Sequence, residues 1–280
     1  MRCWQSARWT GPPSKRARSA LFRPSARGTR TSMWPRLRNW AFGWRMFPHR
    51  KRATPSPAEH AVLLMLALSR QLPEAQRGLR EGRWAQPVGQ ALLGKTACVV
   101  GLGSIGLALA GRLHSFRMRL SATRKSFDKG APGYVRLYRQ AQLAEALSDA
   151  DYVILCVRAG DENKRLFDAR MLAAMKPGAI LVNVARGSLV DEDALLASLD
   201  SGHLRGAGLD VFCKEPADPR HPLVQSPRVI ATPHIAGVTD VNLARMFELL
   251  VENLRRYGRG ETPHYLVNQP ATSRSSRVHN

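Results

Sequence analysis

Short apolar runs alternate with amphipathic stretches from about residue 56 to residue 258. A run such as Thr96–Val100, which is rich in β-branched residues, is typical of a strand that is buried on both faces of a parallel sheet. Strands and helices that alternate at this spacing predict an α/β fold, a doubly wound parallel sheet. Six strands are expected: 96–100, one that ends near residue 126, then 151–157, 179–184, 206–211 and 229–231. The expected helices are 57–71, 74–83, one that begins after residue 103, then 141–147, 168–175, 191–201 and 239–257.

The first of these helices has a recognisable start. Ser56-Pro57-Ala58-Glu59 has the form of a capping box with proline at the first helical position, so we expect the helix to begin at Pro57. Its apolar residues then recur at intervals of three and four, which predicts one buried face. These residues are Ala61, Leu64, Met65 and Leu68.

A glycine motif follows the first strand: Gly101-Leu102-Gly103-Ser104-Ile105-Gly106 reads G-x-G-x-x-G. Gly101 would make the tight turn, Gly103 would let a pyrophosphate approach the backbone, and Gly106 would let the helix pack on the strand. Free N–H groups at the helix start, near Ser104 and Ile105, would hold phosphate with the help of the helix dipole. Because the motif stands between a predicted strand and a predicted helix, it predicts a dinucleotide site.

Three polar clusters follow later strands, at the edge where an open α/β sheet places its ligands. Arg186 lies in 183–187, and its planar guanidinium could bind a carboxylate. Asp210 and Glu215 follow the strand 206–211, and His234 follows the last strand. From the residues alone, each has a second interpretation: a surface arginine, two solvated loop acids and a structural histidine.

Four motifs are recognisable together, in the order GLGSIG (101–106), VNVARGSLVDEDAL (182–195), GAGLDVFCKEP (206–216) and TPHIAG (232–237). In this order and spacing they resemble the D-isomer-specific 2-hydroxyacid dehydrogenases, a family that includes phosphoglycerate dehydrogenases and glyoxylate/hydroxypyruvate reductases. The resemblance covers about residues 54–267, with the segments SPAEHAVLLMLALSR (56–70) and REGRW (80–84). It implies a Rossmann dinucleotide-binding domain and NAD(P)-dependent hydride transfer between a D-2-hydroxy acid and its 2-oxo acid.

The resemblance also implies the roles of the catalytic residues. Arg186 would bind the substrate carboxylate and polarise the 2-oxo group. His234 would be the acid/base that gives a proton to the carbonyl oxygen during reduction and removes it during oxidation. Glu215 would pair with that imidazole, fixing its orientation and favouring the protonated ring.

The cofactor is expected to be NADP or NAD, with NADP preferred. Relatives that prefer NAD usually carry an acid at the end of the second strand, where this chain has Arg124 followed by Lys125. Two cations suit a 2′-phosphate better than a 2′-hydroxyl. The residues expected to bind the cofactor are Gly101, Gly103, Ser104, Ile105, Gly106, Arg124, Lys125, Cys156, Val157, Ala185, Arg186, Asp210, His234 and Gly237.

Charge is concentrated at the front of the chain. The 280 residues carry a formal net charge of +22, but residues 1–58 hold 14 of the 43 Lys and Arg and no Asp or Glu. Residues 59–280 therefore carry only +8, and nucleic-acid binding is not expected of the folded part. The front segment has three interpretations: a mis-assigned start or frame change, an organelle transit peptide, or a basic arm for nucleic acid or anionic lipid. The first is favoured because five of the six tryptophans lie before residue 50, and disordered tails normally avoid large aromatic residues.

Cysteine usage and hydropathy bear on the compartment. The four cysteines are scattered and form no C-x-x-C pair, which favours a reducing compartment and neither a disulfide framework nor a zinc site. The longest apolar run, Ala61–Leu68, is too short for a membrane span. A cytoplasmic location is expected, with organelle targeting by the Arg- and Ser-rich front segment as the alternative.

Relatives usually have about a hundred more residues in front, which form most of a second, flavodoxin-like lobe. Only remnants of that substrate domain are expected here. The expected division of the chain is a non-native or disordered segment at 1–53, the Rossmann domain at 54–238, a helix returning to the substrate domain at 239–267, and a disordered tail at 268–280. A homodimer acting on a small 2-hydroxy or 2-oxo acid is expected. The alternative function is a catalytically impaired dinucleotide-binding fragment or a corepressor-like NAD(P)H sensor.

Overall fold

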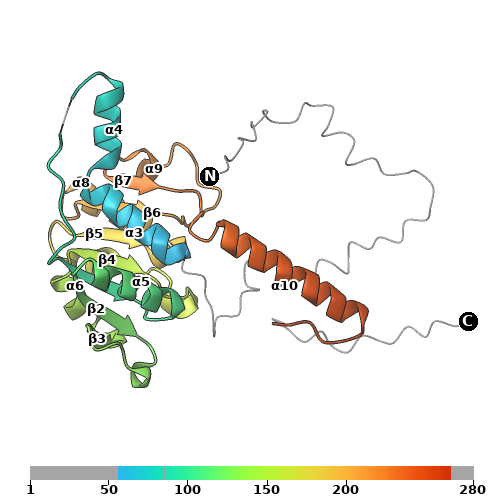
Figure 1. Cartoon of the computed structure of the whole chain (residues 1–280). Helices are drawn as coiled ribbons and strands as arrows, with labels where there is room; N and C mark the ends of the chain where they lie inside the picture. The colour runs from blue at the N-terminus through green and yellow to red at the C-terminus, as the bar shows by residue number, and fades with distance from the viewer. Residues whose placement is uncertain (1–55, 85, 266–280) are drawn as a thin grey trace, which may run out of the picture. The chain divides into compact units, whose positions relative to one another are not determined.

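The structure, a computed structural model, describes residues 56–84 and 86–265 (Figure 1). The expectations for residues 1–53 and for the tail 268–280 lie outside this part of the chain. Within it, no helix is long and apolar enough to cross a membrane.

A parallel sheet is the centre of the described part. Its seven strands run in the order β3-β2-β1-β4-β5-β6-β7, and every neighbouring pair is parallel. Chain order reverses between β1 and β4, so the sheet is doubly wound, which confirms the predicted fold class. The strands are β1 (Thr96–Val100), β2 (Arg119–Arg124), β3 (Val135–Arg139), β4 (Tyr152–Leu155), β5 (Ile180–Asn183), β6 (Gly206–Leu209) and β7 (Val229–Ala231).

Helices and short 3-10 turns make the connections. The α-helices are α3 (Ser56–Ser69), α4 (Leu72–Arg80), α5 (Ser104–Ser115), α6 (Leu143–Ser148), α7 (Ala169–Ala173), α8 (Glu192–Asp200), α9 (Pro222–Gln225) and α10 (Asp240–Gly258). The 3-10 turns are η2 (Phe127–Lys129), η3 (Gln140–Gln142), η4 (Asp161–Asn163) and η5 (Gly187–Leu189).

Each face of the sheet has its own apolar core. Successive strand residues point to opposite faces, so Val99 and Ile154 join α3 and α5 in one core. Val100 and Val153 join α6, α7 and α8 in the other. Figure 1 shows α3 and α5 lying across the first of these faces. Burial on both faces explains why the central strands read as unbroken apolar runs in the sequence.

Strand β3 is missing from the expectations. In Val135–Arg139 buried and exposed positions are mixed, with Val135 and Tyr138 buried and both arginines exposed. The strand lies at the edge of the sheet and pairs only with β2 among the described strands. Its sequence therefore lacks the apolar run that marks the central strands. The short helix α9 was also not expected.

Two predicted helices differ in detail from the structure. Helix α3 spans Ser56–Ser69 among the described residues, and the two side chains of the expected capping box have other partners. Ser56 Oγ instead forms a hydrogen bond with Thr239 Oγ1 at 2.9 Å, and Glu59 accepts a hydrogen bond from Arg112 at 2.9 Å. Helix α4 begins at Leu72 rather than Glu74 and continues through Gly78, because proline is tolerated in a first helical turn.

Candidate dinucleotide and substrate site

The predicted site residues come from strands that end at one edge of the sheet. The glycine motif follows β1, Arg124 ends β2, and Cys156 follows β4. Arg186 follows β5, and the remaining polar residues follow β6 and β7. In an open parallel sheet these carboxyl ends form the ligand crevice.

The glycine turn has the three features that its sequence predicts. Gly101 has φ of +101°, and a Cβ on it would lie 2.7 Å from the Val157 backbone nitrogen. A Cβ on Gly106 would lie 2.2 Å from the Gly101 carbonyl oxygen, so α5 could not approach β1 with any larger residue there. Gly103, by contrast, faces open space, with nothing within 4 Å of such a Cβ. Gly103 is also the N-cap of α5 and makes no side-chain cap bond, so the turn has room for a pyrophosphate at the helix start.

Arg124 and Lys125 lie at the end of β2, as predicted, but their side chains already have partners. Arg124 Nη1 donates hydrogen bonds to the carbonyl oxygens of Gly130 at 2.6 Å and Lys129 at 3.4 Å. Lys125 Nζ is 3.7 Å from a carboxylate oxygen of Glu162, and its side chain is 85% exposed. Arg124 therefore braces the following loop, and Lys125 reaches across to the segment after β4.

The Arg186 loop is held by backbone contacts. Asn183 is buried at the end of β5; its amide donates to the Arg186 carbonyl at 2.9 Å, and its side-chain oxygen accepts from the Ala185 N–H at 3.0 Å. A Cβ on Gly187 would lie 2.0 Å from the Phe212 carbonyl carbon, so this loop packs directly on the main chain that follows β6. The Arg186 side chain is exposed at this edge, with Nη1 donating to the Ala185 carbonyl at 2.5 Å.

His234 and Glu215 are in contact, although 19 residues separate them. His234 Nδ1 lies 2.7 Å from Glu215 Oε2, and the other oxygen of Glu215 accepts from the Phe212 N–H at 3.1 Å. An ionised carboxylate only accepts, so Nδ1 carries the hydrogen of this bond. His234 has φ of 55°, a left-handed backbone that histidine adopts more readily than most residues.

Asp210 is the buried anchor of the loop that carries His234. Its side chain is 1% exposed, and it accepts hydrogen bonds from Thr232 Oγ1 at 2.7 Å and from the backbone N–H groups of Ile235 at 2.8 Å and Ala236 at 2.9 Å. Burial works to raise the pKa of this carboxyl, but the hydrogen bonds from His60, Thr232 and the two backbone N–H groups outweigh it and lower the pKa. Asp210 was expected to bind cofactor, and that role stays a prediction.

The remaining predicted residues lie around the same edge. The Cys156 N–H donates to the Val100 carbonyl at 2.8 Å, and burial raises the pKa of the Cys156 thiol to about 12. Val157 packs under Gly101. The Gly237 carbonyl accepts from the Asn242 side chain at 2.8 Å, which ties the end of the loop to α10.

One polar residue that supports these loops, His60, was not predicted from the sequence, whereas Asn183 and Thr232 belong to the polar clusters that follow predicted strands. His60 Nε2 lies 2.9 Å from Thr232 Oγ1 and 3.4 Å from Asp210 Oδ1. The sequence does hold a signal for His60, since it stands four residues before Leu64 on the buried face of its helix.

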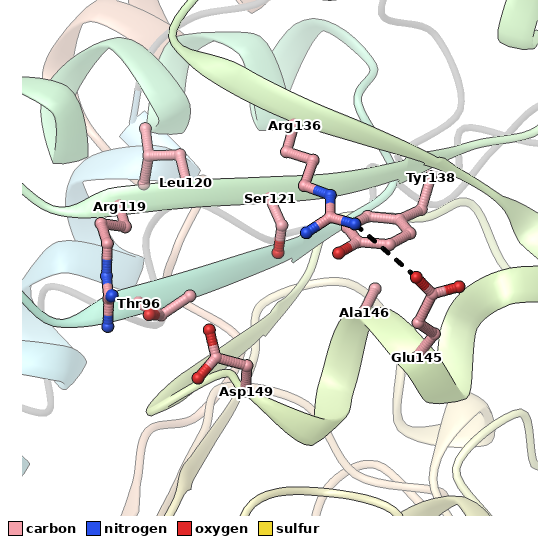
Figure 2. A pocket seen from close by; sticks show the side chains of 9 residues that line it. All are labelled: Thr96, Arg119, Leu120, Ser121, Arg136, Tyr138, Glu145, Ala146 and Asp149. Carbon is pink, nitrogen blue, oxygen red and sulfur yellow. Dashed lines mark ion pairs between the residues drawn. The ribbon is translucent and has the colours of Figure 1, made fainter.

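A separate cavity of about 190 Å³ lies at the opposite, amino end of the strands (Figure 2). Arg136 and Glu145 form an ion pair over it at 3.7 Å. The buried hydroxyls of Thr96 and Ser121 line it and have no hydrogen-bond partner among the described residues. These polar walls suit water, and the cavity is remote in topology from the glycine turn. It is not part of the predicted site.

The sheet order, the open glycine turn and the residues at the strand ends define a Rossmann-type dinucleotide-binding domain, and the residues present fit such a cofactor. The chain belongs to the D-isomer specific 2-hydroxyacid dehydrogenases: the model of that family's NAD binding domain matches residues 62–236. The resemblance inferred from the four motifs is thereby confirmed.

Named relatives support this assignment. Glyoxylate reductase of Korarchaeum cryptofilum is 37% identical over 226 residues, which are 77% of this chain and 67% of that protein. D-3-phosphoglycerate dehydrogenase of Mycobacterium tuberculosis is 40% identical over 222 residues, 76% of this chain and 40% of the relative. The crystal structure of a D-isomer specific 2-hydroxyacid dehydrogenase from Xanthobacter autotrophicus, in complex with NADPH and MES, has a TM-score of 0.64 and 32% identity, covering 76% of this chain and 87% of the other. This chain spans about two thirds of the length of the glyoxylate reductases that it matches.

Proposed function

We propose that this chain catalyses NAD(P)-dependent hydride transfer between a small D-2-hydroxy acid and the corresponding 2-oxo acid. The observation that carries the proposal is the 2.7 Å contact between His234 and Glu215, next to the loop that bears Arg186. An imidazole held by a carboxylate, with a guanidinium nearby, can both exchange a proton and bind a carboxylate.

Each residue then has a separate task. The Arg186 guanidinium binds the substrate carboxylate and draws electron density from the adjacent 2-oxo group. His234 Nε2 donates its proton to the carbonyl oxygen during reduction and takes it back during oxidation. Glu215 keeps the hydrogen on Nδ1 and stabilises the charged ring, while its second oxygen holds its own carboxylate against the Phe212 N–H. The bound nicotinamide supplies or accepts the hydride.

The test is His234→Ala and His234→Gln in the full chain, with glyoxylate and hydroxypyruvate as substrates. We expect NADPH oxidation at 340 nm to be abolished, while cofactor affinity from a fluorescence titration stays within about twofold. His114→Gln is the matched control, because this exposed histidine lies on α5. An unchanged kcat in the His234 variants would remove the assignment. Cofactor binding without turnover in the wild-type chain would favour the impaired fragment or the sensor.

We also propose a preference for NADP over NAD. Arg124 and Lys125 together offer two cations at the end of β2, and the remaining donors of the guanidinium can turn toward a 2′-phosphate. Lys125 Nζ lies 3.7 Å from a Glu162 carboxylate oxygen in an exposed ion pair, which a 2′-phosphate would replace. Dissociation constants for NADPH and NADH, measured for wild type and for Arg124→Asp, decide the question. We expect Arg124→Asp to reverse the preference, and equal affinities in the wild type would contradict it.

We further propose that the chain forms a homodimer in the cytoplasm. Large apolar side chains on and after the first helices are exposed, with Leu79 at 62%, Trp84 at 82% and Val88 at 88%. Contiguous exposed apolar surface marks an interaction site, and an interface between two copies of the chain would cover these side chains. Light scattering coupled to size exclusion should give twice the chain mass, and Leu79→Glu should reduce it to the monomer mass. A monomeric wild type at micromolar concentration would contradict the dimer.

A further inference from the structure

We infer that His60 is a positioning residue for the acid/base histidine, acting through Thr232 and Asp210; the inference rests on the proposed role of His234. His60 lies near the N-terminus of α3, 172 residues before Thr232. Its side chain is only 10% exposed, and its ring contacts Thr232 and Asp210.

The hydrogen bonds form a chain with a defined direction. The Asp210 carboxylate accepts only, so the Thr232 hydroxyl donates to it at 2.7 Å. The Thr232 oxygen is then free to accept, and His60 Nε2–H donates to it at 2.9 Å. The same hydrogen lies within reach of Asp210 Oδ1, 3.4 Å from Nε2. Donors arranged in series toward a buried charge polarise and strengthen one another.

Asp210 in turn holds the backbone of the loop that carries His234. Its backbone carbonyl accepts from the His234 N–H at 2.8 Å, and its carboxylate accepts from the Ile235 and Ala236 N–H groups. Three consecutive N–H groups of the loop therefore bond to one residue. They hold the left-handed backbone at His234, where φ is 55°, and so set the direction of the imidazole.

A second contact ties the same two segments together. Ser56, one helical turn before His60, bonds through its hydroxyl to Thr239 Oγ1 at 2.9 Å. The N-terminal part of α3 thus contacts the loop 232–239 at Thr232 and at Thr239. A helix that merely filled space would need neither polar contact.

The test compares His60→Leu, which removes the donor, with His60→Gln, whose side-chain N–H approximates Nε2–H. Two readouts are taken on the full chain: the ¹⁵N resonances of the His234 ring, and kcat with KM for NADPH and glyoxylate. We expect His60→Leu to shift the His234 ring resonances and to lower kcat about tenfold, with KM for NADPH within about twofold. His60→Gln should restore both readouts to near wild-type values.

Several outcomes would overturn the inference. His234 resonances and kcat that are unchanged in His60→Leu exclude a positioning role, and equal losses in His60→Leu and His60→Gln point to packing alone. If His60→Leu does not fold, Thr232→Val removes the middle hydroxyl at nearly constant shape, and unaltered His234 resonances in that variant refute the inference. A wild type without turnover but with the expected resonance shifts would refute the proposed activity while leaving the role of His60 in place.

Discussion

Replacing Asp210 with asparagine tests a buried carboxylate that accepts several hydrogen bonds from the loop carrying His234. The carboxylate is 1% exposed and accepts hydrogen bonds from Thr232 and Ile235 at Oδ1 and from Ala236 at Oδ2, and His60 Nε2 lies 3.4 Å from Oδ1. In the better orientation of an asparagine amide, the oxygen faces Thr232 and Ile235. The NH₂ group then meets the Ala236 N–H, and two donors oppose each other.

The expected loss of stability follows from these bonds. A hydrogen bond to a charged acceptor contributes about 1.5–3 kcal/mol, and one between neutral groups about 1 kcal/mol. Asp210→Asn loses the bond from Ala236 and weakens those from Thr232 and Ile235 to neutral strength, which amounts to about 3–5 kcal/mol. Because the variant no longer buries a charge, part of this is recovered, and we expect a net loss of about 2–3 kcal/mol.

Urea denaturation at pH 7, followed by circular dichroism, measures this loss. Asp200→Asn serves as the control, since Asp200 is exposed at the end of α8 and should change stability by less than about 0.5 kcal/mol. A loss below about 1 kcal/mol for Asp210→Asn, at unchanged m-value, would refute the view that this carboxylate holds the loop.

The same variant makes a prediction about acid. The folded-state pKa of Asp210 lies below its ordinary value of 3.8, so its contribution is complete above that value and is lost as pH falls through the folded pKa. The difference in unfolding free energy between wild type and Asp210→Asn should therefore shrink steadily below about pH 4. A difference that stays constant down to pH 2.5 would contradict this sign.

Three further predictions concern other parts of the described chain. Gly106→Ala should destabilise the fold by about 1–3 kcal/mol and weaken NADPH binding at least tenfold, measured by urea denaturation and titration, because its Cβ meets a main-chain oxygen at 2.2 Å. Asp151→Asn should flatten the loss of stability in acid, because burial works to raise the pKa of this carboxyl but its bonds from Lys176 and the Thr96 N–H lower it. Burial raises the pKa of the Cys156 thiol to about 12, so iodoacetamide at pH 8 should label it, by peptide mapping, only after denaturation.

The central strands could be predicted because a strand that is buried on both faces has a continuous run of apolar residues. Strands β1, β4 and β5 are covered on both faces, and their residues form apolar runs. Strand β3 has neighbours on one side only, and its two exposed arginines break the pattern. The expected capping box of α3 was less predictable, since the Ser56 hydroxyl bonds to Thr239 rather than to its own helix. Such a contact depends on a segment that is distant in the chain.

In the candidate site, too, local features could be predicted from the sequence and contacts between distant segments could not. The three tasks of the glycines followed from local geometry, and Gly101, Gly103 and Gly106 each have the surroundings that those tasks require. The contact between His234 and Glu215 could be expected only through the resemblance to known dehydrogenases, because no local rule relates residues 19 positions apart. His60 was overlooked, because a single histidine on the buried face of a helix does not reveal its partner in the sequence.

The close packing of Gly187 on the Phe212 main chain has a consequence for protein engineering. The distance between the Arg186 loop and the Glu215 loop is set where two backbones touch, without any side chain between them. Libraries that vary the side chains of these two loops will therefore leave the spacing of their backbones unchanged. Position 187 itself tolerates only glycine, so it should be left out of such libraries, and a change of spacing has to come from altered loop length.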